Sequence, residues 1–218
     1  MSNSIRLCLL FLPCIILIAS GCATTTPYDY TAFKKSRPRS IVVIPPMNNS
    51  IEVNAPYIYL STLTRPLAEK GYYVFPVFVI DYFLKENGLP TPAEMNGIPL
   101  DKIGEHIGAD AVLYVSIEDW GQKYQLIQSV TKVHATLKLV DVKSGELLWD
   151  STAIAQESSG DGGSDLIGML VMAVIDQVLD STIADPTPRL ARQANNAAID
   201  SQLRGMLDGP YKPSNAKE

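Results

Sequence analysis

The chain of 218 residues carries 18 basic and 23 acidic side chains, so its formal net charge at pH 7 is −5, and 46% of its residues are hydrophobic. This mildly acidic balance provides no electrostatic footprint for nucleic acid, which is therefore excluded as a partner. Length and apolar content are those of one domain of ordinary size with its own core.

The N-terminus has the pattern of an export signal. One cation, Arg6, precedes an apolar run over residues 7–18, and small residues follow at 19–21. A permanent membrane helix needs about 20 apolar residues, and this run is shorter and contains Pro13. The pattern therefore predicts a signal peptide over residues 1–21 rather than a transmembrane anchor.

Residues 17–22 resemble the bacterial lipobox, although Ala19 stands where leucine is common. The resemblance implies that Cys22 receives a diacylglycerol and, after cleavage, an N-acyl chain. Two chains already anchor a protein stably, so three make release negligible. The alternative is an ordinary secretory cut that leaves Cys22 free.

The other cysteines and the residue that follows Cys22 agree with this interpretation. Cys8 and Cys14 leave with the signal, so the mature chain retains only Cys22 and forms no internal disulfide. Ala23 stands where an aspartate often retains such proteins in the inner membrane. By analogy we expect an outer-membrane protein that faces the periplasm or the cell surface.

Residues 22–39 read as a flexible tether, because they lack the periodic apolar content needed for packing. Fully extended, such a tether reaches on the order of 50 Å. Its four cations, Lys34, Lys35, Arg37 and Arg39, contact anionic headgroups or are simply solvated. Both alternatives stay open at this point.

The body begins with strand and helix signals in alternation. β-branched residues 41–44 form a buried strand that Pro45-Pro46 ends, helical spacing over 58–68 ends at Gly71, and 72–77 is a second strand. This order predicts a right-handed crossover and parallel pairing. Helices are expected from Val79 to Gly88 and over 98–107.

The second half of the body favours antiparallel strands. Strands are expected over 111–117, 124–130, 132–142 and 147–152, with one buried and one wet face over 132–139. A glycine-rich loop, an apolar helix and a last helix over 189–207 follow, and residues 208–218 are expected to be disordered. We predict a single α/β domain over 40–207, with helices packed on a mixed sheet in two or three layers.

This order of segments resembles the N-terminal domain of TolB and the periplasmic lipoproteins CsgG and LpoB. The chain is most similar to a bacterial lipoprotein family of unknown function within that group. The resemblance implies a TolB N-terminal-domain-like fold, CsgG-like lipoproteins as partners, and a possible homo-oligomer. The segments that carry it are residues 41–46, 67–76, 107–113 and 141–149.

No residue pattern indicates catalysis, a metal or a cofactor other than the lipid on Cys22. His106, beside Glu105 and near Asp110, lies on a helix, and His134 lies on a strand, so they do not converge as metal ligands. The loop over 158–164 lacks the Gly-Lys-Ser/Thr ending of a phosphate cradle. The remaining carboxylates, which a cleft would need to bring together, are Glu118, Asp119, Asp141 and Asp150.

The helix over residues 166–179 is apolar around nearly its whole circumference. Burial, a protein interface and membrane contact are all compatible with this pattern. The candidate interface residues are Leu166, Met169, Leu170, Met172 and Ala173.

The leading functional hypothesis is a membrane-tethered, non-catalytic binding or assembly subunit of an envelope secretion or transport complex. One alternative is an envelope-polymer hydrolase with Glu118 or Asp119 as its general acid. Another is a small-ligand binding lipoprotein with its site in a cleft above Pro45-Pro46.

Overall fold

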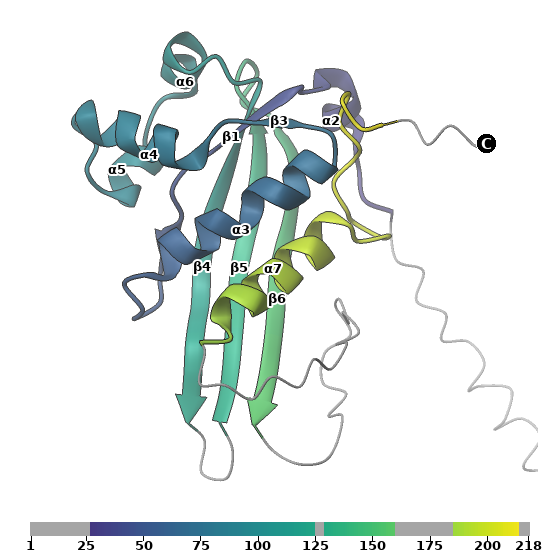
Figure 1. Cartoon of the computed structure of the whole chain (residues 1–218). Helices are drawn as coiled ribbons and strands as arrows, with labels where there is room; N and C mark the ends of the chain where they lie inside the picture. Colours follow the sequence, from purple (N-terminus) through teal and green to yellow (C-terminus); the bar gives the residue numbers. More distant parts are fainter. Residues whose placement is uncertain (1–26, 125–128, 160–184, 214–218) are drawn as a thin grey trace, which may run out of the picture.

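The computed structural model describes residues 27–124, 129–159 and 185–213 (Figure 1). Helices and strands alternate in its first half, and long strands follow. The elements are α2 (Thr31–Ser36), β1 (Ser40–Val43), β2 (Met47–Asn48), α3 (Ala55–Glu69), β3 (Tyr73–Val74), α4 (Val77–Glu86), α5 (Pro92–Asn96), α6 (Leu100–His106), β4 (Ala111–Tyr124), β5 (Ser129–Asp141), β6 (Leu147–Ser159) and α7 (Thr187–Ile199).

The strands form one mixed sheet in the order β3-β1-β4-β5-β6, with β2 paired to β4. Pairing is parallel among β3, β1 and β4, where Ile41 lies opposite Ala111, and antiparallel from β4 through β6. The predicted fold class, parallel in the first half and antiparallel in the second, is confirmed.

The long helices α3 and α7 cover much of one face of the sheet, and shorter helices cover part of the other, while the far ends of β4, β5 and β6 extend beyond the helices (Figure 1). α3 and α7 lie side by side on the first face, above the fully buried β5 residues Val133, Ala135, Leu137 and Leu139. On the opposite face α4, α5 and α6 pack near β1, whereas His134 of β5 is half exposed. The fold therefore has three layers near β1 and two beyond it.

The long hairpin differs from the predicted strands. β4 continues without interruption past Gly121 to Tyr124, so the separate strand predicted over 124–130 is wrong. Gly121 has a φ of 97°, and a register shift lies between Ile117 and Asp119. A bulge and a flexible glycine absorb local twist without ending a strand.

Two helical predictions also need correction. The segment over residues 92–96, expected as a loop, forms α5, where Thr91 and Glu94 make a reciprocal capping box. The last helix ends at Ile199 instead of Leu207. Residues 200–207 follow α7 without helical structure, and Met206 among them is buried.

The tether predicted over residues 22–39 is wrong for the part that the structure describes. Residues 31–36 form α2, and Phe33 is only 3% exposed against the ring of Tyr72. The hydroxyl of Ser36 donates to Asp141 over 2.5 Å. These contacts fix the segment to the domain.

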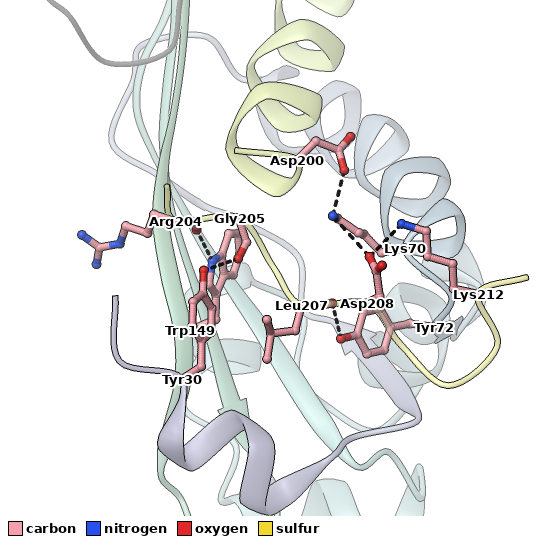
Figure 2. Close-up of polar contacts among 10 residues, drawn as sticks. All are labelled: Tyr30, Lys70, Tyr72, Trp149, Asp200, Arg204, Gly205, Leu207, Asp208 and Lys212. Atoms are coloured by element: carbon pink, nitrogen blue, oxygen red, sulfur yellow. Dashed lines mark hydrogen bonds and ion pairs between the residues drawn. The ribbon is translucent and has the colours of Figure 1, made fainter. Parts of the chain in front are cut away.

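Residues 200–213 form a strap that packs against the core containing Tyr72 and Trp149 (Figure 2). Three aromatic side chains hold its backbone, each donating a hydrogen bond to one carbonyl. The donors are Trp149 to Arg204 (2.8 Å), Tyr30 to Gly205 (2.5 Å) and Tyr72 to Leu207 (2.6 Å).

Ion pairs continue the strap beyond Leu207, so the tail predicted to be disordered from 208 is wrong as far as residue 213. Lys70 Nζ lies 3.1 Å from Asp200 and 3.5 Å from Asp208, and Lys212 lies 2.8 Å from Asp208 (Figure 2). The backbone N–H of Gly209 donates to the carbonyl of Lys70 over 2.7 Å.

Candidate functional site

The outer face of α4 exposes several large apolar side chains. Ile80 and Leu84 point into the core, which orients the opposite side of the helix toward solvent. There Phe78, Val79 and Tyr82 are 64%, 60% and 66% exposed. Contiguous exposed apolar side chains of this size mark interaction surfaces more often than chance.

The edge strand β3 extends this surface. Tyr73 is 52% exposed, and its ring meets that of Phe75 edge to face at a centroid distance of 5.1 Å. β3 has two residues and is followed by Pro76, which limits pairing with a further strand. Binding here is therefore expected through side chains. We call Tyr73, Phe78, Val79, Tyr82 and Phe83 the aromatic surface.

A cavity of about 490 Å³ lies beside the aromatic surface, between α4, α5 and α6. Phe83 lines it and is also 36% exposed, so this ring joins the two features. Most of the lining is apolar, including Leu89, Ile98 and Ile107. An apolar hollow next to protruding rings provides the shape into which a partner's side chains pack.

A fixed charge pair borders this surface. Lys85 donates to Asp81 over 2.7 Å and to the Tyr57 hydroxyl over 3.1 Å, and its ammonium lies 5.1 Å from the Tyr57 ring centre. Hydrogen bonds to Asp81 and Tyr57 raise the pKa of Lys85, which stays charged. Polar groups at the border of an apolar patch are typical of protein interfaces.

The geometry opposes Glu118 as a general acid. Glu118 is exposed on the partly uncovered face of the sheet and accepts a hydrogen bond of 3.0 Å from Asn49. Hydrogen bonds from Ser116 and Asn49 lower the pKa of Glu118, whereas a general acid must hold its proton near neutral pH. Asp119 lies 3.7 Å from Lys132.

The other candidate carboxylates have structural roles. Asp110 accepts from Arg39 and Ser40 at the start of β1. Asp141 binds Ser36 and the turn after β5, and Asp150 binds Tyr28 and Arg204. Each of these acids thus accepts hydrogen bonds from its own set of partners.

The histidines do not converge either. Glu105 is 3.8 Å from His106 on α6, and His134 lies on β5. Within the described ranges, no group of three or more His, Cys, Asp or Glu side chains is arranged to hold a metal ion.

The alternative hypothesis of a small-ligand binding lipoprotein places its cleft above Pro45-Pro46. Both prolines are buried, and Asn96 of α5 donates to the carbonyl of Pro45 over 2.9 Å. The helix α5, which the sequence did not predict, therefore lies against Pro45.

Several predicted features lie outside the described residues. They include the signal peptide, Cys22, residues 160–164 of the glycine-rich loop, and the candidate interface over 166–173. Among the helices that the structure does describe, none combines the length and the hydropathy needed to span a bilayer.

Comparison with known proteins places this fold in a family. Residues 28–211 match the family model described as "Putative lipoprotein GNA1162-like". The chain belongs to this family. Over 198 residues it is 38% identical to "Putative lipoprotein NMB1124/NMB1162" of Neisseria meningitidis serogroup B (strain ATCC BAA-335 / MC58), which covers 89% of this chain and 92% of that protein.

One solved structure agrees with the family assignment. The crystal structure of lipoprotein GNA1162 from Neisseria meningitidis has 41% sequence identity and a TM-score of 0.54, covering 61% of this chain and 92% of that one. The C-terminal domain of LpoB from Salmonella enterica is more distant, with 18% identity, a TM-score of 0.38, and coverage of 66% and 94%. The predicted lipoprotein family is confirmed, whereas acylation at Cys22 and the outer-membrane location stay predictions.

The aromatic surface of this GNA1162-like chain was missed by the sequence analysis. Residues 77–84 are apolar at every position except Asp81, so the helix is apolar on nearly all sides. The same test that selected residues 166–179 would have selected this segment. The chain passes from strand to helix here without a polar break, so the sequence alone does not indicate which face of the helix points outward.

Proposed function

We propose that this GNA1162-like protein is an outer-membrane-anchored lipoprotein that acts, without catalysing a reaction, as a binding and assembly subunit of an envelope secretion or transport complex. Cys22 is its lipidation site in this proposal, carrying a diacylglycerol and an N-acyl chain. Membership in a lipoprotein family supports the anchor. The aromatic surface is the observation that supports the binding role.

The aromatic surface has the energetics of a docking site. Burying a large apolar side chain fully is worth about 1.5–3 kcal/mol, so covering Phe78, Val79 and Tyr82, each about two-thirds exposed, supplies several kcal/mol. Aromatic residues close to a cavity are also the residues that dominate binding energy at interfaces. A monomer in isolation gains nothing from exposing them.

CsgG-like lipoproteins are the partners that the family resemblance favours, and a second copy of this chain is the alternative. Both partners would bind the same feature, which is the aromatic surface beside the apolar cavity. Short β3 disfavours strand addition, so the contact is made by side chains. The two partners differ in the mass of the complex that each forms.

Photo-crosslinking in intact cells tests the proposal. A photoreactive phenylalanine analogue replaces Tyr82 in the full-length protein, and the adduct is identified by mass spectrometry. We expect an adduct with an envelope lipoprotein, or a dimer if the chain pairs with itself. Phe78→Glu in the same chain should abolish the adduct, because a charge would be buried at the contact.

Leu203 provides the matched control, since it is 75% exposed but lies on the strap instead of α4. The analogue at Leu203 should give no adduct, and Leu203→Glu should leave the Tyr82 adduct intact. Equal labelling at both positions, or no adduct at Tyr82 in cells that contain the lipidated protein, would reject the aromatic surface as the binding site.

A further inference from the structure

The first described residue, Pro27, lies close to the proposed lipid anchor. Only residues 23–26 separate it from Cys22. A chain spans at most about 3.6 Å per residue, so the Cα atoms of Cys22 and Pro27 lie within about 18 Å of each other in any conformation. A tether of about 50 Å is therefore replaced by a link that keeps this side of the domain beside the membrane.

The point where the chain enters the domain is firmly held. The Tyr28 hydroxyl donates to Asp150 over 2.8 Å and accepts from the Asp150 backbone N–H over 3.0 Å. The Arg204 guanidinium lies 4.7 Å from the centre of the Tyr28 ring. Asp150 is near the start of β6, so the anchor attaches at the end of the sheet where α2 lies (Figure 1).

Cations gather at this α2 end. Residues 27–39 hold four basic residues and one acid, Asp29, and Lys143 follows β5 beside Ser36 and Asp141. Two of these cations face acids, Lys35 with Glu146 at 3.7 Å and Arg39 with Asp110 at 3.9 Å. In the described part of the chain, no acid lies within 4 Å of the charged groups of Lys34, Arg37 and Lys143.

The segment that forms α4, α5 and α6 has the opposite balance. Residues 77–107, which form α4 to α6, hold two lysines and five acids. An anionic surface therefore attracts the α2 end and repels the helices that carry the aromatic surface. Each cation near an anionic bilayer contributes about 1 kcal/mol.

A cavity of about 390 Å³ opens at the α2 end, and its lining combines cationic and apolar side chains, as a contact with a phospholipid requires. Lys34 and Arg37 line it together with apolar Phe33 and Leu207. Its one acid, Asp208, is already paired with Lys70 and Lys212. A phosphate above apolar chains is the chemistry that this mixture suits.

We propose that the α2 end is the membrane-facing surface of the domain, and that Lys34, Arg37 and Lys143 bind anionic phospholipid headgroups there. This inference rests on the proposed acylation of Cys22. The strands then point away from the bilayer. Gln156 lies nine residues along β6 from Leu147, so at about 3.3 Å per residue it stands roughly 30 Å farther out.

Depth-dependent fluorescence quenching tests the orientation on the mature, lipidated protein in vesicles. Because Cys22 is acylated, a cysteine introduced at exposed Thr31 or at exposed Gln156 is the only free thiol for a dye. The quencher is a headgroup-labelled lipid. In vesicles of phosphatidylglycerol and phosphatidylcholine (3:7), we expect at least threefold more quenching at Thr31 than at Gln156.

Two charge variants separate the contact from the anchor. Lys34→Glu/Lys143→Glu should reduce the quenching ratio toward one, as should vesicles of phosphatidylcholine alone. Arg189→Glu/Arg192→Glu makes the same charge change at exposed positions on α7 and should keep the ratio. Equal quenching at the two positions would overturn the inference. So would a quenching ratio that changes neither with the charge of the lipid nor with Lys34→Glu/Lys143→Glu.

The mass of the N-terminal peptide reports on acylation separately. An unmodified Cys22 would contradict the proposed anchor, whereas an acylated chain with equal quenching would contradict only the orientation. Crosslinking at Tyr82 reports on the binding role in a third, independent way.

Discussion

The hydroxyl of Tyr59 on α3 donates a 2.5 Å hydrogen bond to the side-chain oxygen of Asn195 on α7, and both residues are fully buried. The Asn195 amide in turn donates to the hydroxyl of Thr62 over 2.8 Å. Burial raises the pKa of Tyr59 far above its ordinary value, so the phenol stays protonated and remains a donor. This network joins the two helices through Tyr59 and Asn195, which are 136 residues apart in the sequence.

Breaking that network should weaken the whole domain. We expect Asn195→Ala to lower the free energy of unfolding by about 2–3 kcal/mol, because it leaves a buried phenol without its acceptor. Tyr59→Phe should cost about 1–2 kcal/mol, and the double variant should cost less than the two together. Urea denaturation monitored by tryptophan fluorescence measures all three. Fully additive costs would show that the two side chains do not interact.

Asp141 should make stability depend on acid pH. Burial alone would raise the pKa of Asp141, but hydrogen bonds from Ser36, Ser144 and Lys143 outweigh it and lower that pKa. The stabilisation is therefore complete above the unfolded pKa of about 3.9 and is lost as pH falls through the lower folded value.

Asp141→Asn tests this linkage. It should cost about 1–3 kcal/mol at pH 7, with the difference from the natural chain shrinking as pH falls below 4. Urea denaturation between pH 3 and pH 7 measures the difference. Glu86→Gln, at an exposed position on α4, is the control and should cost little at any pH. A cost for Asp141→Asn that is constant over this pH range would contradict the assignment.

Gly71 and Gly88 form a matched pair for testing the strap. Both have positive φ, 89° and 84°, but a Cβ at Gly71 would lie 2.2 Å from the backbone nitrogen of Lys212, whereas one at Gly88 meets nothing within 4 Å. Gly88→Ala should therefore cost about 1 kcal/mol of unfolding free energy, from backbone strain.

Gly71→Ala should cost clearly more than this. In a chain that ends at Asp208, the clash with Lys212 is absent, and the cost of Gly71→Ala should approach that of Gly88→Ala. Thermal and urea unfolding provide the comparison, with each variant measured against the natural or the truncated chain that it was made from. An unchanged cost after truncation would mean that the strap does not pack on this turn.

Side chains on the two faces of α4 should respond in opposite ways. Ile80 is 5% exposed, so Ile80→Ala should cost about 2–5 kcal/mol of stability. Tyr82→Ala on the outer face should change stability by less than about 0.5 kcal/mol while weakening partner binding. Unfolding and co-purification measure the two effects. A large loss of stability for Tyr82→Ala would indicate that its ring supports the fold.

Local patterns explain which parts of the fold were predictable. β1 contains a continuous β-branched run, the helix α3 ends before a glycine, and β5 alternates between polar and apolar residues over positions 132–139. Each signal lies within a few residues of the element that it specifies. The parallel and antiparallel halves of the sheet follow from the same signals.

Long-range contacts explain what was missed. Phe33 is an isolated apolar residue in a cationic segment, and it is buried because residues distant in sequence, Tyr72 among them, pack around it. Residues 208–211 are held by backbone hydrogen bonds, such as Tyr211 to the carbonyl of Gly71. Backbone bonding leaves no trace in side-chain composition. For the candidate site, the exposure of Tyr82 depends on which face of α4 packs against the sheet. The apolar pattern of this helix does not predict that face.

The strap also constrains the order in which the protein can fold. Met206 is 2% exposed, and the carbonyls of Arg204, Gly205 and Leu207 receive the hydrogen bonds of three aromatic residues. Synthesis runs from the N-terminus, so these residues are made only after the three aromatic residues that bind them. The long hairpin therefore lacks its closing contacts until residues 204–207 are present. Completion of the fold is thus postponed to a late stage of chain synthesis.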